Sequence, residues 1–217
     1  MLITKLIKVS LNMSFFLFIK IFFICLFGAM SPGPSMLLVI NNALKSKLNG
    51  YMSSIGHGLA IGLYALLSVI GLELLTQNYY NVFLVLKIAS IVFLFYIGVV
   101  SIITNEKEKI TDKAHNISSY WIAFLEGFTI AILNPKIFIF FTAIYSQFIS
   151  LENNIILNFT LVFTAMIVDI MWYIILTILV TVLGFKNFFD KKIFLIRKIV
   201  GLLFILISIV LMINLLK

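Results

Sequence analysis

The chain has 217 residues, of which 63% are hydrophobic and 11% are charged, and its net charge is +8. A soluble domain of this length needs a charged surface, so the composition excludes a soluble globular protein and indicates a polytopic membrane protein. The basic residues lie in short connections between apolar segments. This distribution argues against a nucleic-acid surface and predicts contact with anionic membrane lipid.

Six apolar segments follow one another along the chain, and each is long enough for a spanning helix, which needs about 20 residues. They lie at about residues 15–42, 51–76, 82–103, 120–149, 155–183 and 193–216. The connections are too short to hold a second domain. We therefore predict a single all-α transmembrane domain over residues 1–217, with translation starting at Met1 or at Met13.

The lysines and arginines are distributed unevenly between the two sides of this arrangement. Ten lie at the first, third and fifth connections and their flanks: Lys45, Lys47, Lys107, Lys109, Lys113, Lys186, Lys191, Lys192, Arg197 and Lys198. The opposite side holds Lys5, Lys8, Lys20 and Lys217. Because basic connections stay in the cytoplasm, we expect both termini to face away from it.

The first and fourth segments contain helix breakers near their centres, in "GAMSPGP" and "AILNPK". Ser and Asn are preferred N-caps and proline suits the first helical position, so we predict helix starts at Ser31–Pro32 and at Asn134–Pro135. Such starts leave backbone N–H groups free at mid-membrane, around Ser35 and Met36 and around Ile137 and Phe138, where they favour a carboxylate. The alternative is a simple proline kink in each spanning helix.

The two breaks also mark an internal repeat. "KIASIVFLFYIGVV" in the third segment is matched by "KIVGLLFILISIVL" in the sixth. Since each half holds three segments, the second copy must be inverted in the membrane, as in many secondary transporters. We predict repeats at about residues 14–103 and 120–217, joined by a cytoplasmic linker at about 104–119.

Ionisable residues within membrane segments are costly and commonly functional. Asp169 lies at the centre of the fifth segment, and Lys136 follows Pro135. The two residues either form a structural pair, or Asp169 holds a substrate ammonium or a proton while Lys136 faces a carboxylate. His57 and Glu126 are secondary candidates. The alternatives are a packing histidine or a proton relay for His57, and the cytoplasmic rim or the site for Glu126.

Other chemistry is not indicated. Cys25 is the single cysteine and is interpreted as a packing residue, and no His, Cys or Glu cluster has metal-ligand spacing. An intramembrane aspartyl protease would need two aspartates, and only Asp169 lies in a segment. We predict a protein that is not an enzyme and has no metal and no cofactor. Gly58 and Gly62 have GxxxG spacing, which is typical of close helix packing.

Five motifs in order resemble the amino-acid exporter family of the LysE/RhtB type. They are "SPGP", a glycine-rich second segment, "LKIASIVFLFYIG", "GFTIAILNPK" and an aspartate followed by "MWY". The resemblance implies a secondary carrier that exports amino acids across the bacterial inner membrane. The family's first motif falls on Pro32, Gly33 and Pro34, its fourth-segment motif on Asn134, Pro135 and Lys136, and its fifth-segment acidic residue on Asp169.

From these observations we expect a proton-coupled exporter of an amino acid or a similar small zwitterion. The site is expected at the midplane between the repeats, with protons carried by Asp169. The expected substrate-binding residues are Ser31, Pro32, Gly33, Pro34, Ser35, Asn134, Pro135, Lys136 and Asp169. A passive channel or a membrane-embedded assembly factor is the alternative, and the sequence leaves open whether the protein forms homo-oligomers.

Overall fold

A computed structural model describes residues 18–104, 119–149 and 155–216, which contain helices and no strand. Seven of the helices are α2 (Pro34–Lys45), α3 (Lys47–Asn78), α4 (Tyr80–Ile103), α5 (Tyr120–Ile132), α6 (Pro135–Tyr145), α7 (Ile155–Thr181) and α8 (Lys186–Leu215). A first helix, Phe18–Met30, precedes α2. The predictions about Met13, Lys5 and Lys8, and nearly all of the predicted linker, lie outside the described residues.

The helices include two bent pairs that coincide with the first and fourth apolar segments. Phe18–Met30 and α2 meet at 69°, and α5 and α6 meet at 58°. Four further helices in the described part of the chain are long and apolar enough to cross a membrane, which gives up to 6 spans if each bent pair is one span. The predicted all-α polytopic fold, with its first and fourth segments broken at proline, is confirmed.

The first predicted connection is much shorter in the structure. α3 begins at Lys47, and only Ser46 separates it from α2. The Ser46 hydroxyl accepts a hydrogen bond from the backbone N–H of Asn49 at 3.1 Å. A serine cap of this kind satisfies one of the unpaired donors at a helix start, and it allows the new helix to begin directly after the old one.

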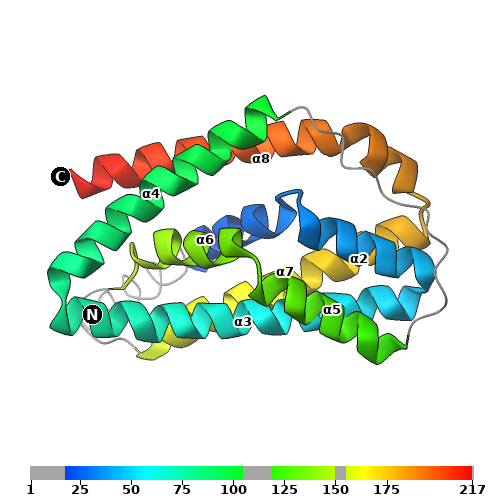
Figure 1. The fold of residues 1–217 in the computed structure, drawn as a ribbon, viewed down its shortest axis with the longest axis horizontal. Helices are drawn as coiled ribbons and strands as arrows, with labels where there is room; N and C mark the ends of the chain where they lie inside the picture. The colour runs from blue at the N-terminus through cyan, green and yellow to red at the C-terminus, as the bar shows by residue number, and fades with distance from the viewer. Residues whose placement is uncertain (1–17, 105–118, 150–154, 217) are drawn as a thin grey trace, which may run out of the picture.

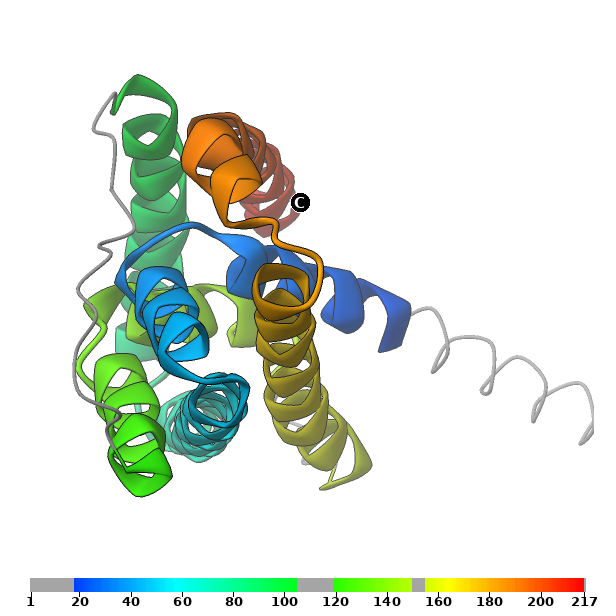
Figure 2. The ribbon, with the colours of Figure 1, turned by 90° about the vertical axis from the view of Figure 1, so that its right-hand side faces the viewer.

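The element order is a bent pair followed by two long helices, and it occurs twice along the chain. α4 and α8 run side by side along one edge of the molecule, while α3 lies beside α5 and α7 at the opposite edge (Figure 1). The first helix and α6 lie between these two groups, as the turned view also shows (Figure 2). The inverted relation of the two halves stays a prediction.

Glycines allow the closest helix contacts. A Cβ atom at Gly58 of α3 would lie 2.1 Å from Cγ1 of Ile170 on α7, which confirms the packing role predicted from the GxxxG spacing. A Cβ at Gly98 of α4 would lie 2.8 Å from the carbonyl oxygen of Gly201 on α8, and one at Gly201 would lie 2.7 Å from that of Gly98. The backbones of these neighbouring helices therefore touch.

Candidate functional site

The first break lies between Met30 and Pro34. The backbone N–H of Ser31 bonds the carbonyl of Gly28 at 3.2 Å, and α2 begins at Pro34 with extended Gly33 as its N-cap. The predicted start at Pro32 with Ser31 as its cap is therefore wrong by two residues. The physical reason is that a residue directly before proline is disfavoured in the α conformation, so Gly33 cannot continue a helix begun at Pro32.

The second break has the predicted form. Pro135 is the first residue of α6, and the side chain of Asn134 accepts a hydrogen bond from the backbone N–H of Lys136 at 3.0 Å. The expectation of free N–H groups at Ile137 and Phe138 is wrong, because both donate to the carbonyl of Asn134, at 3.1 and 3.5 Å. This helix start is thus closed by its own cap residue.

The start of α2 leaves donors available. The first bond into α2 runs from the N–H of Leu37 to the carbonyl of Gly33 at 3.1 Å, and the N–H groups of Ser35 and Met36 have no hydrogen-bond partner among the described residues. The hydroxyl of Ser35 is also buried and without a partner in that part of the chain. As predicted, the N-terminus of α2 therefore has unsatisfied groups suited to an anion.

A cavity of about 410 Å³ joins the two breaks. The nine residues predicted to bind substrate all line it: Ser31, Pro32, Gly33, Pro34, Ser35, Asn134, Pro135, Lys136 and Asp169. Cys25 and His57 line it as well. Segments that are about a hundred residues apart in the sequence therefore line one cavity, whose volume falls within the range of about 300–1,000 Å³ usual for small-molecule sites.

Asp169 and His57 form a buried pair at this cavity. Oδ2 of Asp169 lies 2.7 Å from Nδ1 of His57, and the two residues are 4% and 2% exposed. The ring of Tyr173 packs edge-on against the His57 ring, with centroids 4.7 Å apart. Asp169 thus pairs with His57, a contact between α7 and α3 that the sequence did not predict.

The remaining ring nitrogen of His57, Nε2, is buried and has no hydrogen-bond partner among the described residues. A buried polar atom of this kind is uncommon, because leaving a donor or acceptor unsatisfied costs about 1–3 kcal/mol. Both alternatives weighed for His57 are compatible with this environment, since the residue packs against Tyr173 and holds a carboxylate that can share a proton.

Lys136 connects the two breaks directly. Its Nζ atom donates a hydrogen bond to the hydroxyl of Ser31, and it lies 5.6 Å from the centroid of the Phe204 ring on α8. The ammonium of Lys136 therefore reaches from the start of α6 to the end of the first helix. It supplies a positive charge at Ser31, three residues before the first residue of α2.

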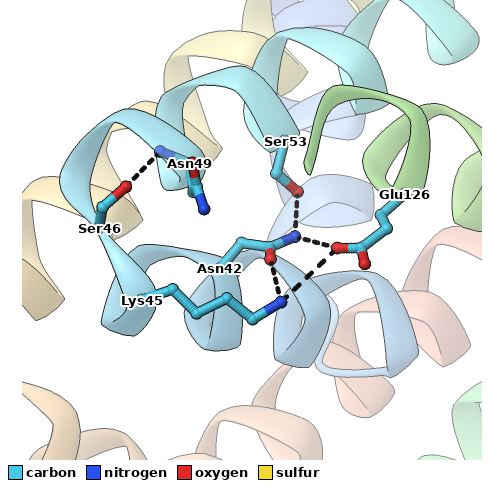
Figure 3. A network of polar contacts seen from close by, with 6 residues as sticks. All are labelled: Asn42, Lys45, Ser46, Asn49, Ser53 and Glu126. Atoms are coloured by element: carbon cyan, nitrogen blue, oxygen red, sulfur yellow. Dashed lines mark hydrogen bonds and ion pairs between the residues drawn. The ribbon is translucent and has the colours of Figure 1, made fainter. Parts of the chain in front are cut away.

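Glu126 lies outside the cavity in a separate polar network that joins α2, α3 and α5 (Figure 3). The amide nitrogen of Asn42 donates to Oε2 of Glu126 at 2.8 Å and to the hydroxyl of Ser53 at 3.4 Å. Lys45 donates to Oδ1 of Asn42 at 3.0 Å and lies 4.0 Å from Glu126. This placement favours the rim over the site for Glu126.

Comparison with known proteins gives a consistent result. The sequence model of the family described as "LysE type translocator" matches residues 26–215. The uncharacterized membrane protein YrhP of Bacillus subtilis (strain 168) is 26% identical over 188 residues, which cover 80% of this chain and 88% of YrhP. No solved structure matches the chain.

Proposed function

The chain belongs to the LysE type translocator family, and from this premise we propose that it exports an amino acid across the bacterial inner membrane in exchange for protons. As a translocator it is a membrane-embedded transport protein with a small-molecule substrate. The observation that carries the proposal is the single cavity lined by both helix breaks, Lys136 and Asp169.

The two ends of an amino acid have matching partners in this cavity. The carboxylate would bind Lys136 together with the N–H groups and hydroxyl at the start of α2, where Ser35 has unsatisfied donors. The ammonium would bind Asp169. Pro34 keeps Gly33 extended at the first break, next to Pro32. Asn134 and Pro135 fix the start of α6, which carries Lys136.

Proton coupling is expected because the proton and the substrate ammonium bind the same carboxylate, that of Asp169. A proton held between His57 and Asp169, at 2.7 Å, and a substrate ammonium at Asp169 compete for the same oxygen atoms. Binding of the ammonium inside the cell displaces the proton, and binding of a proton from outside displaces the ammonium. Exclusive occupancy of this kind couples the outward flux of substrate to the inward flux of protons.

Alternating access needs two parts that move against each other around the cavity. The predicted repeats at about 14–103 and 120–217 supply these parts, and the two breaks lie where they meet. Backbone outside a helix at membrane depth is tolerated when it lines a cavity, which supports a functional role for the breaks over simple proline kinks.

The test is flux in proteoliposomes that contain the purified protein. We expect uptake of a labelled amino acid into vesicles that is saturable, that requires an imposed pH gradient, and that stops when a protonophore is added. A passive channel gives flux that does not saturate and follows only the gradient of the amino acid. A membrane-embedded assembly factor gives no flux above that of empty vesicles.

A further inference from the structure

We propose that the substrate is an amino acid with a neutral, apolar side chain, and not a basic or an acidic one. This inference rests on the proposed export function and concerns the same cavity. Two observations carry it: the number of charged groups in the cavity wall and the chemistry of the remaining wall.

The charged groups are just sufficient for the α-ammonium and α-carboxylate of one substrate. Among the residues that line the cavity, Asp169 is the one acid and Lys136 is the one lysine or arginine. The Asp169 carboxylate is in addition already in contact with His57 at 2.7 Å. A lysine substrate would bring a second ammonium without a carboxylate. A glutamate substrate would bring a second carboxylate without a lysine or arginine, and His57 is already in contact with Asp169. An unpaired buried charge is strongly unfavourable.

The wall beyond the charged groups is apolar. It is formed by Ile61, Ile137, Phe140, Phe141, Ala165 and Phe204, which come from α3, α6, α7 and α8. Of the other polar side chains, Ser31 contacts the Lys136 ammonium and Tyr173 packs on His57. Asn134 accepts from the backbone N–H of Lys136, and Ser35 lies at the start of α2, where the substrate carboxylate is proposed to bind. A substrate side chain directed away from the two charged ends therefore meets aliphatic and aromatic groups.

The aromatic part of this wall borders the proposed carboxylate site. The Phe204 ring lies beneath the ammonium of Lys136 and packs against Phe140, with ring centroids 5.9 Å apart. A Cβ atom at Gly28 would lie 2.7 Å from Cζ of Phe140, so the ring can pack here because Gly28 has no side chain. An apolar substrate side chain gains contact area here, whereas a polar one loses its water hydrogen bonds.

The experiment is a competition series with the wild-type protein in proteoliposomes. Each unlabelled amino acid is tested against the gradient-driven uptake of a labelled substrate. We expect leucine, methionine and phenylalanine to inhibit at concentrations at least about tenfold lower than lysine or glutamate, the smallest discrimination usual for an apolar pocket. Valine should compete better than threonine, which differs from it by a hydroxyl in place of a methyl group.

Equal competition by lysine or glutamate would overturn the substrate class and leave the export function standing. Absence of gradient-driven flux for every amino acid would instead overturn the proposed function itself. The two failures are therefore distinguishable in one series.

A matched pair of variants tests the argument that the cavity wall has a carboxylate for only one substrate ammonium. Ala165 lies one helical turn before Asp169, is 1% exposed and lines the cavity. Ala165→Asp adds a second carboxylate and should improve the competition by lysine at least about tenfold relative to leucine, because the second ammonium gains a partner. Ala165→Asn has the same size without the charge and should not. Lysine competition that does not differ between the two folded variants contradicts the argument, and the wild-type series decides if neither variant folds.

Discussion

His57 contacts the carboxylate of Asp169, which in the proposed mechanism holds a proton in one state and a substrate ammonium in another. The contact of 2.7 Å between Nδ1 and Oδ2 fixes the carboxylate at the cavity wall. Because this contact joins His57 to the proposed proton site, replacement of His57 should change how transport responds to pH.

The variant His57→Gln keeps an amide that can donate to Asp169 but cannot take up a proton. We expect transport by this variant to vary less with external pH than transport by the parent, because one of the two groups that hold the proposed proton can no longer bind it. Protein levels in the membrane should stay normal. The measurement is initial flux at saturating substrate over a series of external pH values. An unchanged pH profile would leave His57 with a packing role only.

Lys136 is proposed to bind the substrate carboxylate, and its replacement tests this contact. Lys136→Gln removes the charge and keeps a hydrogen-bond donor near Ser31. A hydrogen bond to a charged group contributes about 1.5–3 kcal/mol, so the half-saturating concentration of the amino acid should rise about 10- to 100-fold.

An analogue that lacks the carboxylate provides the control for this prediction. The corresponding amine should inhibit the parent and the Lys136→Gln variant equally. Equal weakening of the amine and the amino acid would show that Lys136 does not contact the carboxylate.

Residues of the candidate site could be predicted from the sequence where they are unfavourable within an apolar membrane segment. Pro32, Pro135, Asp169 and Lys136 are conspicuous within apolar segments, and the structure brings all of them to one cavity. The pairing of Asp169 with His57 was not predictable. It depends on how α3 and α7 are positioned against each other, and hydropathy contains no information about that position.

At the scale of helices, the rules for helix starts predict the second break better than the first. Asn134 and Pro135 offer one possible start, and α6 begins there. "SPGP" offers two prolines, and the helix begins at the second one, Pro34. The signal that identifies Pro34 is the restriction that each proline imposes on the preceding residue, which prevents Gly33 from being helical. Ser31 is then free of a capping role, and it accepts a hydrogen bond from Lys136.

The contact of α4 with α8 depends on Gly98 and Gly201. Gly201→Ala would place a methyl group 2.7 Å from the Gly98 carbonyl oxygen and 2.9 Å from Cβ of Ser101, so the helices must move apart. Overpacking of this kind costs about 1–3 kcal/mol. We expect a lower midpoint of thermal unfolding in detergent, followed by the helical circular dichroism signal.

Gly71→Ala is the matched control for this prediction. Gly71 lies inside α3, and a Cβ there would have nothing within 4 Å. Alanine is favoured over glycine in helices by about 1 kcal/mol, so this variant should unfold at the same or a higher temperature. Equal destabilisation by both substitutions would contradict the packing argument.

For the whole molecule, the number and position of the apolar segments were enough to predict the all-α fold. Long apolar stretches have few alternatives to spanning helices, because backbone groups must be satisfied within the segment. The orientation in the membrane and the inverted relation of the two halves are set by charge asymmetry and by helix contacts, and both stay predictions.

Orientation can be measured with two cysteines in a Cys25→Ser background. Leu216→Cys lies at the C-terminal end, and Leu48→Cys lies by the first basic connection; both leucines are exposed. If both termini face away from the cytoplasm, an impermeant thiol reagent labels Leu216→Cys in intact spheroplasts and labels Leu48→Cys only after the membrane is opened. The reverse pattern would contradict the predicted topology.

The central claim is that Asp169 binds the substrate ammonium and the coupled proton in the cavity between the two breaks. The most direct test compares pH-gradient-driven amino-acid flux in Asp169→Asn and Glu73→Gln. The latter removes a carboxylate near the end of α3 whose Oε2 accepts from Asn158 at 3.4 Å, away from the cavity. At equal protein levels, we predict that the flux through Asp169→Asn is at least about tenfold lower than that of the parent, as expected for the loss of a charge-assisted contact. The flux through Glu73→Gln should equal that of the parent. Flux by Asp169→Asn with the rate and pH dependence of the parent would contradict the account.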